Sequence, residues 1–327
     1  MSASIGVPFN DAYKLTSGNR QRIFTRTVGN GNSGAERLRA GDMPNLRITP
    51  KFTLPRSGKF FTIGSCFARN VEAQLLALGV DCLSAKCLIP GAYYDGGGTD
   101  RNGALNAYTP QTMRELVNWA SRSDRKDVGL LQLGDDEWCD MLLSGLKVLT
   151  RAQTDEVREI VLNTYDQLKN ADVVVLTLGL TEAWYDLEDN IFVNRSPAGT
   201  SRTMKKAERY SFCNASPEET VSVVDQAILD IARVTGGRAK VILTTSPVPL
   251  HATFTSRDVI SANLYSKSTL FSASLIVADR YDFVDYFPSY ELVMYSDPTT
   301  TWMEDGAHIF PDRVGKVIKI FADTYFV

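Results

Sequence analysis

Two kinds of segment alternate along the chain after about residue 50. Short apolar runs rich in β-branched residues, typical of strands covered on both faces, occur at 59–65 (KFFTIGS), 172–180 (DVVVLTLGL) and 240–247 (KVILTTSP). Stretches with apolar residues at helical spacing lie between and beyond them, at 67–80, 109–123, 154–171, 216–237, 261–280 and 312–326. The run YDFVDYF at 281–287 continues this alternation.

Helix start signals support this reading. Thr109 is a cap residue followed by Pro110, which suits the first turn of a helix. Ser216 is followed by proline and, three residues on, by Glu219, and that helix ends at two glycines. Strands that alternate with helices throughout predict an α/β fold with a parallel sheet, right-handed crossovers and helices on both faces.

The first 50 residues have a different character. They are polar, rich in Gly, Asn and Arg, and carry no sustained periodicity, so we expect an extended arm or surface loops there. Residues 51–327 are expected to form a single domain. The glycine-rich segment at 85–108 is expected to be a long loop beside the functional site.

Composition excludes several classes of protein. A chain of 327 residues that is 44% hydrophobic can bury a sizeable core. A net charge of -3 argues against a nucleic-acid or anionic-membrane partner. No apolar run is long enough to span a membrane, and the opening residues do not read as a secretory signal. Five irregularly spaced cysteines suit free thiols, and we expect a cytoplasmic protein.

Candidate chemistry is sought at the strand ends, because ligands of an open parallel sheet bind outside the carboxyl ends of its strands. These positions are Gly64-Ser65-Cys66, 179–184, 246–250 and the loop before the last helix. The last loop contains Asp305 and His308. An Asp-x-x-His on a tight loop can turn its carboxylate onto Nδ1 of the imidazole, which leaves Nε2 free to take a proton from a hydroxyl.

Two nucleophiles stand side by side after the first strand. Cys66 is the more reactive group if the helix start lowers the pKa of its thiol, although cysteine is also a common small buried residue. Ser65 needs a base, and His308 with Asp305 supplies one.

Metal and nucleotide sites are not expected. The chain has two histidines and no H-E-x-x-H or paired-cysteine motif. It also lacks a G-x-G-x-x-G after a predicted strand and a Walker loop. We therefore expect neither a metal ion nor a nucleotide cofactor.

The residues GSCFA at 64–68 resemble the signature of the GSCFA family, a branch similar to the SGNH/GDSL hydrolases. The resemblance continues, in order, through LNAYTP (105–110), TLGLTEAW (177–184), SPVPL (246–250), ANLYSKSTL (262–270), YFPSYE (286–291) and EDGAHIFP (304–311). It implies a flavodoxin-like three-layer α/β/α fold and acyl hydrolysis or transfer. It also implies a serine nucleophile, matched by Ser65, and an Asp-x-x-His, matched by Asp305 and His308.

The oxyanion hole departs from the SGNH pattern. The serine directly follows glycine, and the block that usually reads Gly-x-Asn-Asp appears here as residues 179–182, GLTE. Thr181 therefore stands at the asparagine position, and Asn106 is an equally suitable donor. Either one is expected to assist the Ser65 backbone N–H, together with the positive end of the following helix.

Two further residues of the 179–184 segment are candidates for substrate binding. Glu182 is expected to bind a substrate hydroxyl or to anchor a loop arginine such as Arg69. Trp184 is expected either to form an aromatic wall for a sugar ring or to pack the core, together with tyrosines of the glycine-rich loop, which are Tyr93, Tyr94 and Tyr108.

These features predict a serine acyl-ester hydrolase that acts on O-acyl groups, such as acetyl, of a glycan or another small ester. A first alternative is an acyltransferase that uses the same residues on a sugar hydroxyl. A second is a non-catalytic glycan-binding or assembly module of the same fold, which the altered oxyanion block favours.

Overall fold

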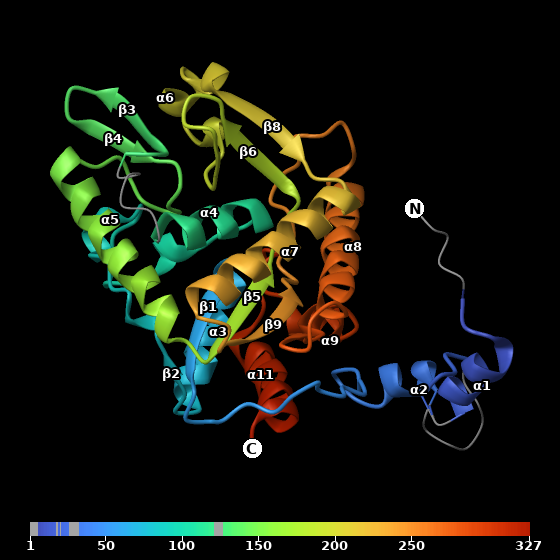
Figure 1. Ribbon diagram of the computed structural model, residues 1–327. Coiled ribbons are helices and arrows are strands. Elements are labelled where there is room, and N and C mark those ends of the chain that lie inside the picture. Colours follow the sequence, from blue (N-terminus) through green and yellow to red (C-terminus); the bar gives the residue numbers. More distant parts are fainter. Residues whose placement is uncertain (1–5, 18, 20, 26–32, 121–126) are drawn as a thin grey trace.

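The computed structural model describes residues 6–17, 19, 21–25, 33–120 and 127–327. A five-stranded parallel sheet in the order β10-β9-β5-β1-β2 forms its centre (Figure 1). The strands are β1 (Lys59–Gly64), β2 (Asp81–Cys82), β5 (Val173–Leu178), β9 (Lys240–Thr245) and β10 (Val284–Tyr286). Helices flank this sheet, so the predicted α/β class and the three-layer α/β/α arrangement are confirmed.

Each face of the sheet has its own apolar layer, because neighbouring residues of a strand point to opposite faces. Phe61 and Ile63 pack with α4, α5, α7 and α8, whereas Phe60 packs with α3, α9 and α11. The bounds are α3 (Cys66–Ala77), α4 (Pro110–Ala120), α5 (Arg151–Asp166), α7 (Pro217–Val234), α8 (Val259–Ala278), α9 (Ser289–Met294) and α11 (Pro311–Tyr325). The predicted helix at 109–123 therefore corresponds to α4, and its residues 121–123 lie outside the described part of the chain.

Two small antiparallel sheets break the predicted alternation of strands and helices (Figure 1). One pairs β3 (Leu130–Gly134) with β4 (Glu137–Asp140), and the other has the order β7-β6-β8. The strands of the second are β6 (Glu182–Asp186), β7 (Ile191–Val193) and β8 (Tyr210–Asn214), and the short helix α6 (Ser201–Met204) precedes β8. These two sheets share an apolar cluster that includes Leu142 and Ile191. The expectation of parallel pairing throughout was wrong for this region.

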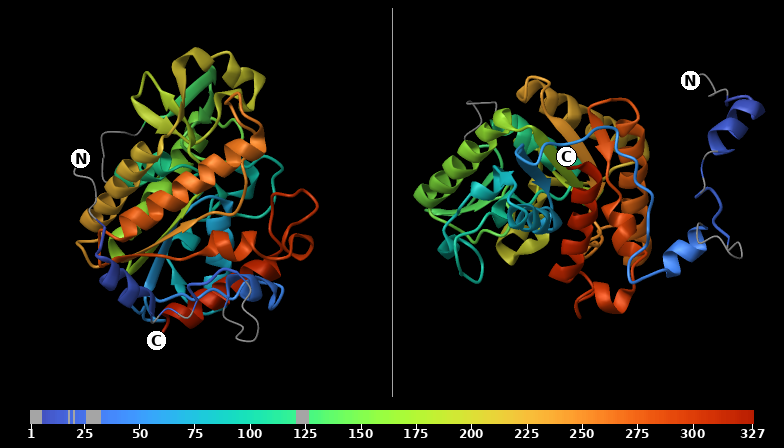
Figure 2. Two further views of the ribbon diagram at one scale, coloured as in Figure 1. Left: turned by 90° about the vertical axis from the view of Figure 1, so that its right-hand side faces the viewer. Right: turned by 90° about the horizontal axis from the view of Figure 1, so that it is seen from below.

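The N-terminal segment forms an arm that leaves the body (Figures 1 and 2). It contains α1 (Phe9–Ser17) and α2 (Gly34–Arg39), and residues 1–5, 18, 20 and 26–32 of the expected arm lie outside the described chain. Its C-terminal part returns to the body, where Leu46 and Ile48 pack on the α11 side of the core. Asp42 pairs there with Arg313 of α11 at 3.1 Å.

The order of the strands locates the functional edge. The chain passes from β1 outward to β2 and then returns to β5 on the other side of β1. Connections from β1 and β5 thus leave in opposite directions, and a crevice forms outside the carboxyl ends of two such neighbouring strands. The residues that follow β1 and β5 are Ser65 and Gly179, so the strand order places both at this crevice.

Candidate active site

The turn after β1 presents a hydroxyl at the start of α3. Gly64 has φ +158°, and a Cβ there would lie 2.7 Å from the backbone oxygen of Thr177, so a side chain does not fit. Ser65 is the N-cap of α3, and its Oγ accepts a hydrogen bond from the Phe67 N–H at 3.4 Å. Ser65 is 3% exposed, so its hydroxyl is buried at the positive end of a helix.

The thiol beside this serine has a different environment. Burial raises the pKa of Cys66, although the N–H groups at the helix start act in the opposite direction. A thiol with a raised pKa is mostly protonated at neutral pH and is a weak nucleophile. Of the two neighbouring candidates, the site geometry therefore favours Ser65.

Asp305 and His308 form a hydrogen-bonded pair on the loop before α11. Asp305 Oδ2 lies 2.5 Å from His308 Nδ1, and its other oxygen accepts from the backbone N–H groups of Ala307 and His308 at 2.9 Å each. These bonds hold the pKa of the Asp305 carboxyl well below its usual range. A bridge between Trp302 and Ile309 closes the loop. With Nδ1 facing the carboxylate, Nε2 is the ring nitrogen that can accept a proton.

The structure does not bring His308 into contact with Ser65. Within the described residues, the hydrogen bond of Ser65 Oγ to another side chain is to Ser246 Oγ at 3.2 Å, whereas the His308 ring bonds Asp305. The His308 side chain is 58% exposed. The Ser65 hydroxyl is therefore buried, whereas the His308 imidazole lies near solvent.

An open hollow lies between the His308 loop and the segment that follows β9. Trp302, Met303 and Gly306 line it on one side, and Pro247 and Pro249, which follow Ser246, line it on the other. Its volume is about 440 Å³. The loop that carries the imidazole thus faces the end of β9 across this hollow.

Asn106, one of the two expected oxyanion donors, lies beside the end of β1. It pairs with Gly64 in a parallel bridge, and the next residue, Ala107, donates its N–H to the Gly64 oxygen at 2.9 Å. Its side-chain Oδ1 is buried and has no hydrogen-bond partner within the described residues. The Asn106 backbone thus pairs with the residue that precedes Ser65, and its side-chain oxygen, which is an acceptor, has no bond within the described residues.

Thr181 has a structural task instead. Its Oγ1 donates to Asn214 Oδ1 at 2.8 Å, and its N–H donates to Ser266 Oγ at 3.0 Å. These bonds tie the end of β5 to β8 and α8. The Thr181 hydroxyl proton is therefore directed at Asn214, and the role of Thr181 or Asn106 as an oxyanion donor stays a prediction.

Glu182 anchors a loop, but not through arginine. Its carboxylate accepts from Thr253 Oγ1 at 2.6 Å and from the Phe254 N–H at 2.9 Å. Arg69, the expected partner, instead pairs with Glu72 at 2.8 Å. Glu182 therefore fixes the segment after β9. Both of its carboxylate oxygens already accept hydrogen bonds from that segment.

Trp184 lines a hollow of about 130 Å³ together with Tyr108, Leu250 and Phe254. Its ring meets that of Phe254 edge to face at a centroid distance of 4.9 Å. The other two expected tyrosines lie elsewhere, since Tyr93 bonds Glu156 and Tyr94 is buried beneath Arg101. The aromatic wall is thus built from Trp184, Phe254 and Tyr108.

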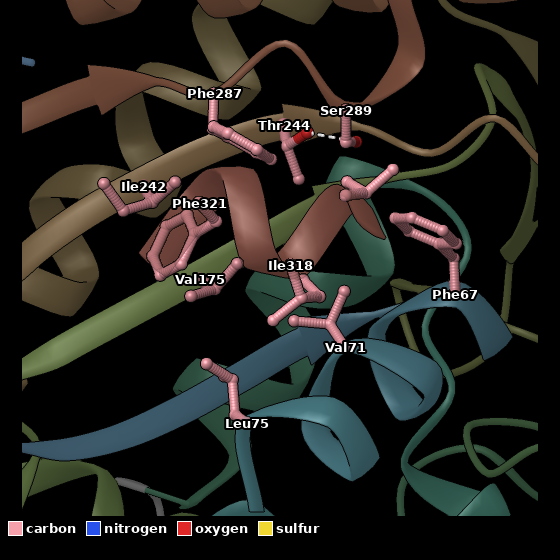
Figure 3. A pocket seen from close by; sticks show the side chains of 11 residues that line it. Phe67, Val71, Leu75, Val175, Ile242, Thr244, Phe287, Ser289, Ile318 and Phe321 are labelled. Carbon is pink, nitrogen blue, oxygen red and sulfur yellow. Dashed lines mark hydrogen bonds between the residues drawn. The ribbon is translucent and has the colours of Figure 1, made fainter. Parts of the chain in front are cut away.

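A third cavity lies beneath α3 and is a packing void (Figure 3). Phe67, Val71 and Leu75 of α3 point into it from one side, and Ile318 and Phe321 of α11 from another. Its two polar groups, Thr244 and Ser289, bond each other. Its volume of about 10 Å³ has room for about one water, so it is not a substrate site.

Sequence reasoning assigned no role to two buried residues at this edge, Ser246 and Lys267. Ser246 directly follows β9, and the strand-end rule includes it. Lys267 of α8 is fully buried, and its Nζ donates to the oxygens of Gly179 and Val248 at 2.7 and 2.6 Å. A single charged residue within the long apolar stretch 259–278 is the signal that could have identified it.

Lys267 should make stability depend on pH. Burial lowers the pKa of its ammonium from 10.5 to about 7, and the neighbouring Cys66 acts less strongly in the opposite direction. Between these values the unfolded chain binds one more proton than the folded protein, so the free energy of unfolding rises with pH. The destabilisation caused by burying the charged ammonium is complete below pH 7 and disappears as the pH approaches 10.5.

Lys267→Met should remove this dependence. Relative to the variant, the wild type should gain up to about 1.4 kcal/mol per pH unit between the two pKa values. Urea unfolding at pH 7, 8 and 9 measures it. Parallel pH curves for the two proteins would show that Lys267 keeps an ordinary pKa.

The described part of the chain contains neither a cluster of metal ligands nor a helix that could span a membrane. In the described ranges, His, Cys, Asp and Glu side chains do not gather in groups of three or more that could hold a metal ion. The helices in those ranges all fall short of the length and apolarity that crossing a bilayer requires.

Comparison with known proteins identifies one family. The model of the GSCFA family matches residues 59–321, which include the Ser65 turn, the 179–184 and 246–250 segments and the Asp305–His308 loop. A search of curated proteins returned no match.

Proposed function

The chain belongs to the GSCFA family, and from this premise we propose that it is a serine hydrolase of acyl esters. Ser65 is the nucleophile, His308 the general base and Asp305 the residue that orients the imidazole. The observation that carries the proposal is the 2.5 Å contact of Asp305 with Nδ1 of His308, because it leaves Nε2 as a proton acceptor.

The reaction runs in two half-reactions. Ser65 Oγ bonds to the acyl carbon while its proton passes to His308 Nε2, and the carbonyl oxygen becomes an oxyanion. The Ser65 N–H, at the positive end of α3, and the Asn106 amide stabilise this charge. The bond to the alcohol then breaks as His308 returns the proton to the leaving oxygen. Water attacks the acyl-serine by the same steps, which releases the acid and restores Ser65.

The mechanism requires the His308 loop to close onto Ser65. The Asp305–His308 pair is half exposed, with 58% of the His308 side chain and 49% of the Asp305 side chain accessible, whereas the next residue, Ile309, is buried in the core. Exposed residues with few buried contacts move at a lower free-energy cost than core residues, so we expect the movement to be confined to the residues before Ile309. Closure across the hollow beside Pro247 would cover the reaction centre and exclude water from it.

The aromatic hollow favours a glycan ester as substrate. Trp184 and Tyr108 line it, and Tyr108 lies two residues from Asn106. Aromatic faces in such a hollow suit the apolar face of a sugar ring. The same hollow would hold an acceptor sugar, which keeps acyl transfer as a second candidate. Product analysis with and without a glycan acceptor separates the two reactions.

A fluorophosphonate probe tests the proposal. We expect the wild type to be labelled, with the adduct mapped to Ser65, and Ser65→Ala to remain unlabelled and inactive on a short acyl ester. Cys66→Ala, a change at the adjacent residue, is the matched control and should retain labelling. An unlabelled wild type that still binds sugar would favour the non-catalytic module, and labelling that persists in Ser65→Ala would move the nucleophile elsewhere.

A further inference from the structure

A second serine meets the nucleophile. Ser246 is fully buried directly after β9, and its Oγ lies 3.2 Å from Ser65 Oγ. Its backbone N–H donates to the Leu178 oxygen at 2.8 Å, which extends the pairing of β9 with β5 by one residue. The backbone N–H of Ser246 is thus held by the central sheet, whereas the segment that follows Ser246 leaves the sheet.

Lys267 fastens the two loops that surround this serine. Its bonds to the Gly179 and Val248 oxygens join the segment after β5 to the segment after β9, two residues beyond Ser246. Within the described chain, no ion pair involves Lys267. Two acceptors match the two N–H groups of a neutral amine, and the pKa of about 7 makes that form accessible near neutral pH. Lys267 therefore acts as a clamp.

The lone pairs and the proton of Ser65 Oγ indicate the direction of its hydrogen bond with Ser246. Ser65 Oγ has two lone pairs and one proton. The Phe67 N–H occupies one lone pair. If the Ser246 hydroxyl donates to the other, the Ser65 proton is left free for the base. As that proton leaves, Ser65 Oγ gains negative charge, and a hydrogen bond donated to a charged oxygen is stronger than one donated to a neutral hydroxyl.

We infer that Ser246 is a further catalytic residue, which donates a hydrogen bond to Ser65 Oγ as its charge develops, and that Lys267 is the positioning residue that holds it there. The inference rests on the proposed serine chemistry. No proton is transferred from Ser246, so the balance of the reaction is unchanged. The same bond assists the reverse step, when Ser65 Oγ leaves the acyl group during deacylation.

The rate of fluorophosphonate labelling tests the role of Ser246. Ser246→Ala should slow labelling of Ser65 and lower kcat for a short acyl ester by about 10- to 100-fold, the effect of losing a hydrogen bond to a charged group. Ser274→Ala is the matched control, because Ser274 is also a fully buried serine but bonds the Leu270 oxygen within α8. It should label at the wild-type rate.

Two substitutions at Lys267 test the clamp. Lys267→Met fills a similar volume without a donor and should reduce kcat to the level of Ser246→Ala, with KM little changed. Lys267→Gln keeps two N–H donors and should recover part of the rate. This rescue separates positioning from a loss of packing, since a packing role would favour methionine. The comparison of the two Lys267 variants also tests the inference if Ser246→Ala does not fold.

The outcomes distinguish the two proposals. A wild type that is not labelled overturns the serine mechanism and, with it, the role of Ser246. A labelled wild type with Ser246→Ala labelled at the same rate overturns the role of Ser246 alone. Equal kcat values for Lys267→Met and the wild type overturn the clamp.

Discussion

His308→Ala should lower kcat/KM for an acyl ester on the order of 10⁴-fold while leaving stability almost unchanged. The loss follows from removing the group that takes the Ser65 proton. Stability should change by no more than about 0.5 kcal/mol, since an exposed side chain away from the core contributes little. The measurement combines ester turnover with thermal unfolding of the same preparation.

The exposure of His308 makes this test decisive. A buried residue can abolish activity by unfolding the protein, but a side chain that is 58% exposed cannot do so by that route. His251→Ala supplies the control, because His251 is the other histidine of the chain and is exposed on the loop after β9. It should retain activity. Wild-type turnover in His308→Ala would show that the base is another group.

Asp305→Asn should lower kcat/KM for the acyl ester in the same way, but for a different reason. The carboxylate accepts from Nδ1–H and so keeps the proton off Nε2, whereas an amide N–H at that position would favour the opposite tautomer. The His308 ring would then remain in place without a basic nitrogen toward the crevice.

Much of the fold could be predicted because local signals agree with the packing. The apolar runs at β1, β5 and β9 are buried along nearly their whole length, and the Ser216 cap begins α7 as its sequence indicates. The start of α5 was missed by three residues, although Thr150 and Gln153 form a capping box there. The strands of the small sheets have five residues or fewer, and buried and more exposed positions do not alternate regularly in β3 or β8, so there is no strand periodicity to identify.

The candidate site could also be predicted only in part. The Ser65 turn and the Asp305–His308 bond depend on neighbouring residues, and their spacing was enough to suggest them. The partners of Thr181 and Glu182 come from β8 and from the loop after β9, 33 and 71 residues away. Single-sequence patterns contain no information on which distant side chain arrives at such a position. Ser246 and Lys267 do carry local signals, but their partners Ser65, Gly179 and Val248 could not be predicted for the same reason.

Glu72 should be the residue of this region on which stability depends most. It is 2% exposed in α3 and pairs with Arg69 at 2.8 Å. Its carboxylate also accepts from Thr62 Oγ1 at 2.6 Å, from Asn102 Nδ2 at 2.6 Å and from the Ser84 hydroxyl. One carboxylate thus joins β1, the helix that Ser65 caps and the loop that leads to Asn106.

Glu72→Ala should lower the free energy of unfolding by about 3 to 5 kcal/mol, because it leaves the Arg69 charge buried and unpaired. Urea unfolding measures this, with Glu156→Ala as the control, since Glu156 is an exposed glutamate of α5 that bonds one tyrosine hydroxyl. Replacing Glu72 and Arg69 together with methionine should restore most of the lost stability, as apolar groups can substitute for a buried pair. The double variant should still hydrolyse ester more slowly, because the bond that fixes Asn102, four residues before the oxyanion donor, is lost. If Glu72→Ala were as stable as the wild type, the Arg69 guanidinium would reach water once its partner is removed.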